Sequence, residues 1–127
     1  MAKWRDGRGQ LRSGTVEVEL EVAASSRSRT RGLLGRDGIE GALLLTPASS
    51  VHTFRMRFAI DVAFLDRRHR IIAMTTMPPN RLGLPRIRSR HVLEAEAGAM
   101  AAWGLRVGSV VELQQGPTQV DALLRSY

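Results

Sequence analysis

The sequence predicts a mainly β fold of the α+β class: a single compact domain, β-sandwich or barrel-like, with two short helices. Apolar and polar residues alternate at the two-residue period of a β-strand in residues 15–22 and again in residues 51–66. A continuous apolar run, ALLLT at 42–46, is typical of a strand that is buried on both faces. The other predicted strands are short and are separated by turn residues, as in small sandwiches and barrels.

The length of 127 residues suits one domain, which we place at residues 15–113. Residues 1–14 are polar and rich in glycine and arginine, and residues 114–127 follow the last predicted strand, so both ends are expected to be flexible or loosely packed. We expect neither a signal peptide nor a membrane span, because no long apolar segment is present. The chain has no cysteine, which excludes disulfides and thiolate zinc sites and favours a cytoplasmic location.

The first half of the domain begins with the strand at 15–22, TVEVELEV, which places four apolar residues inward and three glutamates outward. Ser25 and Ser26 are suitable caps for a short helix that ends near residue 34 and has its arginines on the solvent side. Glycines then mark a turn before the buried strand at 42–46, and residues 47–50 form a loop.

Residues 51–66, VHTFRMRFAIDVAFLD, form the longest alternating stretch and are predicted to supply the centre of the core. One face would carry six apolar side chains: Phe54, Met56, Phe58, Ile60, Val62 and Phe64. The other would carry a polar row of Thr53, Arg55, Arg57 and Asp61, with His52 at its start. This polar row is the best candidate for the location of a site.

In the second half, RRHR at 67–70 predicts a hairpin turn into a strand at 71–76. A long loop with two prolines at its start and four arginines follows over residues 78–90. The domain then ends with a short strand at 91–95, an alanine-rich helix at 97–103 closed by Gly104, and a last strand at 107–113.

The net charge of +7 indicates an anionic partner or a solvated basic surface. Eighteen of the nineteen basic residues are arginine, but they are scattered over several predicted elements, and aromatic residues make up only 5% of the chain. Because base-stacking surfaces need aromatic side chains among the basic ones, we expect no specific nucleic-acid partner. A weak nucleic-acid binder remains the second alternative function.

Two chemistries depend on the histidines and carboxylates. His52, Asp61, His91 and Glu94 are residue types that bind zinc or iron, but they lack a metal-binding spacing and have arginines nearby, so we expect no metal and no cofactor. Alternatively, Asp61 and Glu94 could act as an acid–base pair with His52 as proton carrier, in a small hydrolase or metal-assisted enzyme.

A structural role for the same carboxylates is favoured over the catalytic one. A buried carboxylate is costly unless a cation or hydrogen-bond donors pair with it. We therefore predict that Asp61 pairs with Arg31 or Arg57 and Glu94 with another arginine, and that Asp61→Asn lowers the melting temperature.

Anion binding is the most economical functional interpretation of the charge. Arg31, Arg36, Arg55 and Arg57 could surround a phosphate, a carboxylate or a sugar acid, which guanidinium groups bind through paired hydrogen bonds. The competing interpretation is a basic face with no specific ligand. The leading hypothesis is thus a non-enzymatic binding module for a small anionic or polar ligand, or for a protein segment; the sequence does not indicate an oligomeric state.

The ordered series RGLLGR (31–36), GALLL (41–45), VHTFRMRFAIDVAFLD (51–66), RHRIIAM (68–74) and HVLEAEAGAMAAWGLRVGSVVEL (91–113) resembles the domain of unknown function 192 family. An Arg-Gly-Leu-Met-x-Arg block of that family is matched by Arg31, Gly32, Leu33 and Arg36, with Leu34 at the methionine position. A Pro-Leu-Asp-x-x-Phe block is matched by Ile60, Asp61 and Phe64, with Ala59 in place of proline. A Val-Leu-Glu…Gly block is matched by Val92, Leu93, Glu94 and Gly98.

This chain departs from the family pattern at residues 52–55, HTFR, where many members have Trp-Met-Lys-Asn. The resemblance implies a compact, mostly β fold with short helices. It implies no assigned activity and no catalytic residue. Because the resemblance places Arg31, Arg36 and Glu94 in blocks that accompany Asp61, it also predicts that Arg31 or Arg36 contacts Asp61 or Glu94.

Overall fold

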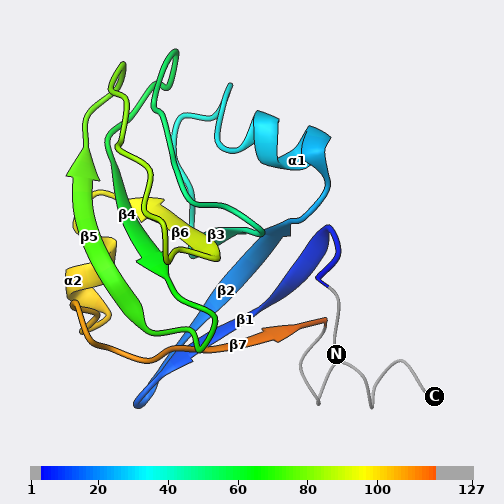
Figure 1. Cartoon of the computed structure of the whole chain (residues 1–127), viewed down its shortest axis with the longest axis vertical. Helices are drawn as coiled ribbons and strands as arrows, with labels where there is room; N and C mark the ends of the chain where they lie inside the picture. Colours follow the sequence, from blue (N-terminus) through cyan, green and yellow to red (C-terminus); the bar gives the residue numbers. More distant parts are fainter. Residues whose placement is uncertain (1–3, 117–127) are drawn as a thin grey trace.

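Seven strands form one mixed sheet in the computed structural model of the protein, which describes residues 4–116 (Figure 1). The strands are β1 (Gly7–Ser13), β2 (Val16–Ala23), β3 (Ala42–Leu45), β4 (Ile60–Leu65), β5 (Ile71–Met77), β6 (His91–Glu96) and β7 (Glu112–Gln115). The helices are α1 (Ser26–Arg31) and α2 (Ala99–Ala102). The strand order is β5-β4-β6-β3-β2-β1-β7, and only the β2–β3 pair is parallel.

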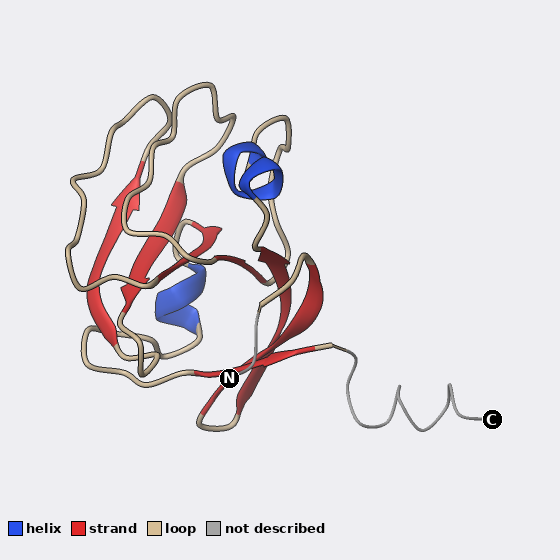
Figure 2. Cartoon of the chain, turned by 45° about the vertical axis from the view of Figure 1, so that its right-hand side comes forward, coloured by secondary structure: helices blue, strands red, loops and turns tan. Residues whose placement is uncertain are grey.

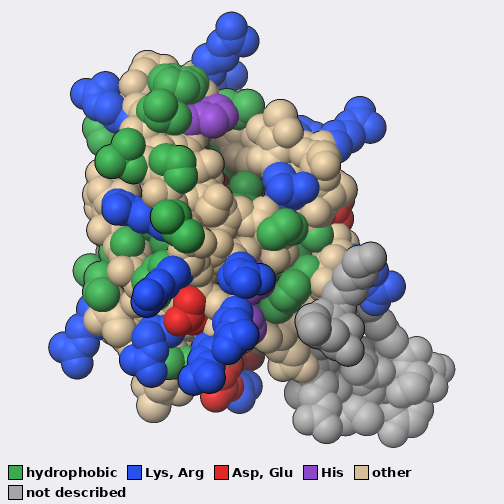
Figure 3. All heavy atoms as spheres, viewed as in Figure 1, with side chains coloured by type: hydrophobic (Ala, Val, Ile, Leu, Met, Phe, Trp, Pro, Cys, Tyr) green, Lys and Arg blue, Asp and Glu red, His purple; other side chains and the backbone are tan. Residues whose placement is uncertain are grey.

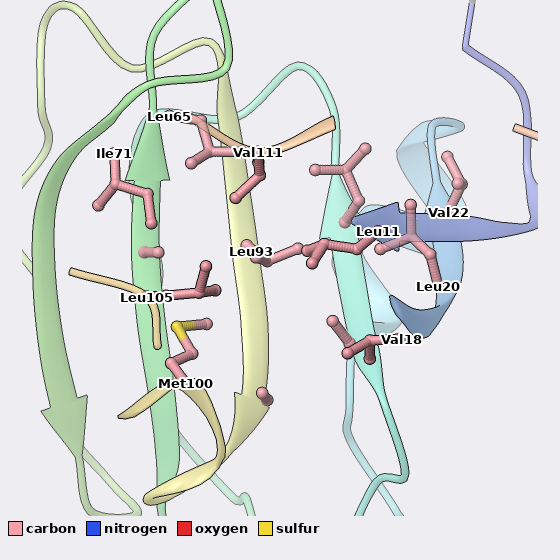
Figure 4. Packing of buried hydrophobic residues seen from close by; sticks show 14 residues of the cluster. Leu11, Val18, Leu20, Val22, Leu65, Ile71, Leu93, Met100, Leu105 and Val111 are labelled. Atoms are coloured by element: carbon pink, nitrogen blue, oxygen red, sulfur yellow. The ribbon is translucent and has the colours of Figure 1, made fainter. Parts of the chain in front are cut away.

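The predicted strand-rich fold with two short helices is therefore confirmed, and the sheet is open rather than closed into a barrel. The sheet nevertheless curves strongly, and α2 lies inside the curve (Figure 2). Apolar side chains from both halves of the sheet fill this inner space, together with Met100 of α2 (Figure 4). Leu11 of β1 and Leu93 of β6 are fully buried there.

The outer face of the sheet has a second core. Val62 and Phe64 of β4 and Val92 of β6 are buried beneath side chains that follow α1 and that lie between β3 and β4, including Leu33 and Met56. Burial on both faces explains why β3 and β4 are buried at every position and why ALLL has no polar alternation.

The N-terminal segment belongs to the sheet, which corrects the prediction that residues 1–14 are loosely packed. Strand β1 pairs with β2 over its whole length and with β7 on its other side, and it buries Leu11. Most of β1 is polar, so its sequence lacks the alternation by which β2 is recognised. At the other end, β7 begins at Glu112, later than the predicted strand at 107–113 and partly within the predicted tail at 114–127. Residues 117–127 lie outside the described residues.

Asp6 joins the start of the sheet to α1. Its carboxylate accepts hydrogen bonds from Ala24 N (2.7 Å), Ser25 N (2.9 Å), Ser25 Oγ (2.6 Å) and Ser28 Oγ (2.7 Å). These donors hold the pKa of Asp6 well below its ordinary value because they stabilise the ionised form. Ser25 in turn caps α1, as predicted, by accepting a hydrogen bond from Ser28 N.

Only the second half of the central stretch is a strand. Ile60–Leu65 forms β4, whereas residues 51–59 run irregularly, with a single β-bridge between His52 and Leu82. Thr53 is fully buried and Phe54 is 45% exposed, the reverse of the prediction. Thr53 is buried because its hydroxyl donates to Pro78 O at 2.7 Å and accepts from the backbone of residue 81 at 2.8 Å, which satisfies the polar group.

The remaining elements lie close to their predicted positions. The strands β5 and β6 each extend one residue beyond the predicted end, and α2 is a shorter helix than predicted. Gly104 follows α2 with a φ of 75°, a left-handed conformation that glycine adopts without strain. No helix within residues 4–116 is long and apolar enough to cross a membrane.

Candidate functional site

Glu94 is the buried carboxylate around which the candidate site is built. It lies on the outer face of β6, the same face as Val62 of β4 in the paired register, and only 3% of its surface is exposed. Its carboxyl forms no hydrogen bond or ion pair with any residue in the described part of the chain. Burial raises the pKa of Glu94 from 4.5 to about 7, because the ionised form loses hydration. At neutral pH this group can therefore either donate or accept a proton.

A cleft of about 80 Å³ lies over Glu94, between the end of α1 and the segment at 50–56. Its apolar lining comprises Leu33, Leu34, Leu45, Val51 and Met56, and its polar lining comprises Arg29, Thr30, Arg31, Ser50, His52 and Glu94. A wider hollow of about 610 Å³ adjoins this cleft and shares Arg29, Thr30, Leu45 and Ser50 with it. The cleft is thus small, and its lining mixes apolar and polar side chains in similar number.

Arg29 supplies a second buried polar group to the cleft. Its Nη1 donates to Pro47 O at 3.1 Å, which connects α1 to the loop after β3. Its Nε is buried and has no partner among the described residues. Buried polar groups in folded proteins normally have hydrogen-bond partners, so Arg29 Nε is unusual among the described residues.

Gly32 allows the chain to pass close to Glu94. It ends α1 with a φ of 47°, and its N–H donates to Ser28 O. A Cβ at this position would lie 4.0 Å from Glu94 Oε1, in strained backbone geometry. The next residue, Leu33, is buried in the outer core and fixes the end of α1 above the sheet.

His52 lies at the exposed side of the cleft. Its ring stacks on that of Phe54, with centroids 5.1 Å apart and an interplanar angle of 24°. The structure thus brings Arg31, His52 and Glu94 of the predicted site residues to one cleft.

The predicted site of four arginines does not assemble. Arg36 forms a two-pronged ion pair with Glu21, at 2.7 and 3.0 Å, which lowers the pKa of Glu21. Arg57 pairs with Asp37 at 3.2 Å. Arg55 is exposed and has a φ of 63°, and its backbone N–H donates to the side chain of residue 80.

Asp61 lies on the opposite face of the sheet from Glu94. In the β4–β6 register Asp61 is paired with Ala95, and side chains alternate between faces along each strand. The Asp61 carboxylate accepts hydrogen bonds from Thr76 Oγ1 (2.7 Å), Gly98 N (2.9 Å) and Met100 N (3.1 Å). It therefore fixes the start of α2 and is not part of the cleft.

This geometry corrects two predictions. Within residues 4–116, no basic side chain lies within 4.0 Å of either carboxylate, so every predicted arginine contact of Asp61 and Glu94, with Arg31, Arg36 or Arg57, is wrong. Backbone amides and a hydroxyl replace the expected cation at Asp61. The acid–base group of His52, Asp61 and Glu94 is also not assembled, because Asp61 faces the inner core.

His91 is also separated from the cleft, because side chains alternate between faces along β6 and residues 91 and 94 lie on opposite faces. Its Nδ1 lies 2.8 Å from Thr46 Oγ1, and its ring packs against those of Trp4 and His69. Burial is the main cause that lowers the pKa of His91 to about 4, which keeps the ring neutral. The described residues contain no group of three His, Asp or Glu side chains that could hold a metal ion.

Arg29 is the site residue that sequence reasoning missed. The prediction placed all arginines of the first helix on its solvent side. Leu33 lies beyond Gly32, which ends α1, so helical spacing from Leu33 does not assign Arg29 to the cleft. The contact depends on how the end of α1 packs against the loop after β3, where Arg29 Nη1 donates to Pro47 O.

Comparisons with known proteins show a family without an assigned activity. Residues 9–113 match the model of DUF192, described as Uncharacterized ACR. A UPF0127 protein of Pyrococcus horikoshii is 32% identical over 87 residues, which cover 65% of this chain and 76% of that protein. A UPF0127 protein of Pyrococcus abyssi is 28% identical over 101 residues, covering 76% and 86% of the two chains. A solved structure of a protein of unknown function from Novosphingobium aromaticivorans is similar in fold, with a TM-score of 0.68, 21% identity and coverage of 83% and 82%.

The hydrogen bonds of Asp61 predict different outcomes for two substitutions. Asp61→Ala leaves two backbone N–H groups without their acceptor and should lower the free energy of unfolding by about 2–4 kcal/mol. Asp61→Asn can keep an oxygen on those N–H groups and donate its amide to Thr76, so it should cost much less. Urea denaturation of both variants measures the difference. Equal destabilisation by Asn and Ala would contradict the hydrogen-bonding role and favour a role for the charge itself.

The raised pKa of Glu94 predicts a pH-dependent effect of Glu94→Gln. The folded protein holds the Glu94 proton more tightly than the unfolded chain does, so this stabilisation is complete below about pH 4.5 and is lost as the pH rises through about 7. Glutamine removes the charged form, so the variant should gain stability relative to the parent as the pH rises, by roughly 3 kcal/mol at alkaline pH.

Denaturation curves at a series of pH values measure this difference, with Glu96→Gln, exposed on the same face of β6, as the matched control. A constant difference between Glu94→Gln and the parent across the pH series would show that Glu94 is not desolvated.

Proposed function

The chain belongs to the DUF192 family of uncharacterised proteins, and from this premise we propose that it is a non-enzymatic binding module for a small organic anion held over Glu94. The observation that supports this proposal most strongly is the pair of unsatisfied polar groups in one cleft. Arg29 Nε is a buried atom without a hydrogen-bond partner among the described residues, and Glu94, 3% exposed, lines the same cleft with no protein partner for its carboxyl. A ligand that supplies these partners would bind the native state and stabilise it.

The dimensions and lining of the cleft favour a ligand with two chemically different ends. The inner volume of about 80 Å³ admits only a few non-hydrogen atoms, while the adjoining hollow of about 610 Å³ has room for a larger group. A hydroxyl or amino group at the inner end can hydrogen-bond to Glu94. A carboxylate or phosphate farther out can bind Arg29 and Arg31.

The apolar lining of the cleft indicates the chemistry of the middle part of the ligand. Leu33, Val51 and Met56 offer contacts to a short aliphatic segment between the two polar ends. The proposed ligand class is therefore the small hydroxy or amino acids and their phosphorylated equivalents. A cytoplasmic location, which the cysteine-free sequence favours, is part of the same proposal.

The alternative, a small hydrolase or metal-assisted enzyme, receives less support. It requires His52, Asp61 and Glu94 in one site, but Asp61 faces the inner core and is engaged by Thr76 and by the start of α2. His52 and Glu94 supply a histidine and one carboxyl to the cleft. The other carboxylate of the proposed acid–base pair, Asp61, lies on the opposite face of the sheet.

A thermal-shift screen of hydroxy acids, amino acids, sugar acids and their phosphate esters at neutral pH tests the proposal, because a ligand of the native state raises the melting temperature. Calorimetric titration of the strongest compound then compares Glu94→Gln and Arg29→Gln with two matched controls outside the cleft, Glu40→Gln and Arg27→Gln. The cleft variants should weaken binding by at least about tenfold, which corresponds to the loss of a charge-assisted hydrogen bond.

Equal affinity in all four variants would place the compound elsewhere and contradict the proposal. Turnover of the bound compound that disappears in Glu94→Gln would instead favour the enzymatic alternative.

A further inference from the structure

A second hollow, of about 450 Å³, is lined by Asp66, Arg67, Arg68, Arg70, Ile87, Arg88 and Arg90. It shares no lining residue with the cleft over Glu94, and it shares Arg90 with the hollow of about 610 Å³ that adjoins that cleft. Five arginines against one carboxylate leave four formal positive charges, and none of these arginines forms an ion pair with another residue of the described chain. We propose that this arginine hollow binds a small polyphosphate, the di- or triphosphate group of a soluble ligand.

One side of the arginine hollow is a turn that Asp66 holds in place. Asp66 Oδ1 accepts hydrogen bonds from Arg68 N at 2.8 Å and Arg70 N at 3.0 Å, and Asp66 N donates to Arg70 O at 3.0 Å. The backbone donors hold the pKa of Asp66 below its ordinary value, so the carboxylate remains engaged with the turn. Three arginines within four residues are thereby attached to a rigid backbone.

The other side is the end of the 78–90 loop, which backbone hydrogen bonds attach to the same turn. Arg90 N donates to Leu65 O at 2.7 Å, directly before Asp66, and Arg86 N donates to Ser49 O at 2.8 Å. The Arg86 guanidinium lies over the Phe64 ring, 5.3 Å from its centroid. Arg88 is therefore carried by a fixed segment, and preorganised groups lose less entropy when a ligand binds.

The charge and size of the arginine hollow indicate the class of ligand. Guanidinium groups bind phosphate oxygens through paired, charge-assisted hydrogen bonds, and a triphosphate supplies a charge close to the four that are unbalanced here. The volume is that of a small-molecule site. Figure 3 shows basic side chains gathered on the lower part of the molecule, with acidic side chains among them.

The lining also favours a small ligand over a nucleic acid or a membrane. No aromatic side chain lines the hollow, although sequence-tolerant nucleic-acid binding depends on aromatic stacking. Ile87 is the one apolar side chain in the lining, and the exposed Leu82 and Leu84 of the same loop lie outside it.

Calorimetric titration of the full chain with inorganic tripolyphosphate, and separately with orthophosphate, tests the proposal. Tripolyphosphate should bind more tightly than orthophosphate. Its affinity should fall as the salt concentration rises, because salt screens exposed charges. The double variant R67Q/R88Q should weaken tripolyphosphate binding by at least about tenfold. The matched control R27Q/R81Q loses the same charge outside the hollow and should change the affinity by less than about twofold.

Arg67 and Arg88 line neither the cleft over Glu94 nor the hollow that adjoins it, so failure of this test is distinguishable from failure of the proposed function. Equal weakening by the two double variants would show that net charge alone attracts the anion and would overturn the proposal. Absence of binding to the parent would overturn it as well. Tighter binding of a single-stranded oligonucleotide or of phosphatidylglycerol vesicles, lost in R67Q/R88Q, would assign the hollow to a macromolecular surface instead.

Discussion

The burial of a carboxylate in the middle of the sheet is the constraint on which the candidate site depends. Strand β6 lies between β3 and β4, and the segments around α1 and before β4 cover its outer face, so the side chain at position 94 is only 3% exposed and reaches the surface through the cleft. An ionised carboxylate there would be costly without a partner. The protein meets this constraint by raising the pKa of Glu94 to about 7. Shifts of this kind concentrate at functional sites, where a local cost to stability is retained for binding or chemistry.

Asp61 and Glu94 are similar residues that lie on opposite faces of the sheet, because side chains alternate along each strand, and they therefore have different surroundings. Both carboxylates are nearly fully buried and they lie on neighbouring strands, in adjacent register positions. Asp61 faces inward, where a hydroxyl and two backbone amides at the start of α2 satisfy it. Glu94 faces outward, toward a cleft whose other unsatisfied group is Arg29 Nε. The hydrogen bonds of the first residue account for it by stability alone, whereas the second has no protein partner in the described part of the chain and is the basis of the proposed ligand site.

Much of the fold could be predicted from local patterns. Alternation identifies β2, the apolar run identifies β3, and Ser25 marks the start of α1. The pattern failed where tertiary hydrogen bonds decide the structure. Thr53 is buried because residues 78–81 satisfy it, and the polar strand β1 is held by pairing on both sides. The candidate site was predictable only in part, because the face on which Asp61 or Glu94 lies depends on sheet register, which the sequence of one strand does not specify.

The most direct test of this account is a carbon-13 NMR titration of the Glu94 side-chain carboxyl in the ligand-free protein, assigned with Glu94→Gln. The account predicts a midpoint near pH 7, because the group is desolvated and lacks an internal cation. A midpoint near the ordinary value of 4.5 would contradict it. Such a result would mean that water or an unrecognised donor hydrogen-bonds to Glu94, and that the cleft does not hold an unpartnered carboxyl with a raised pKa.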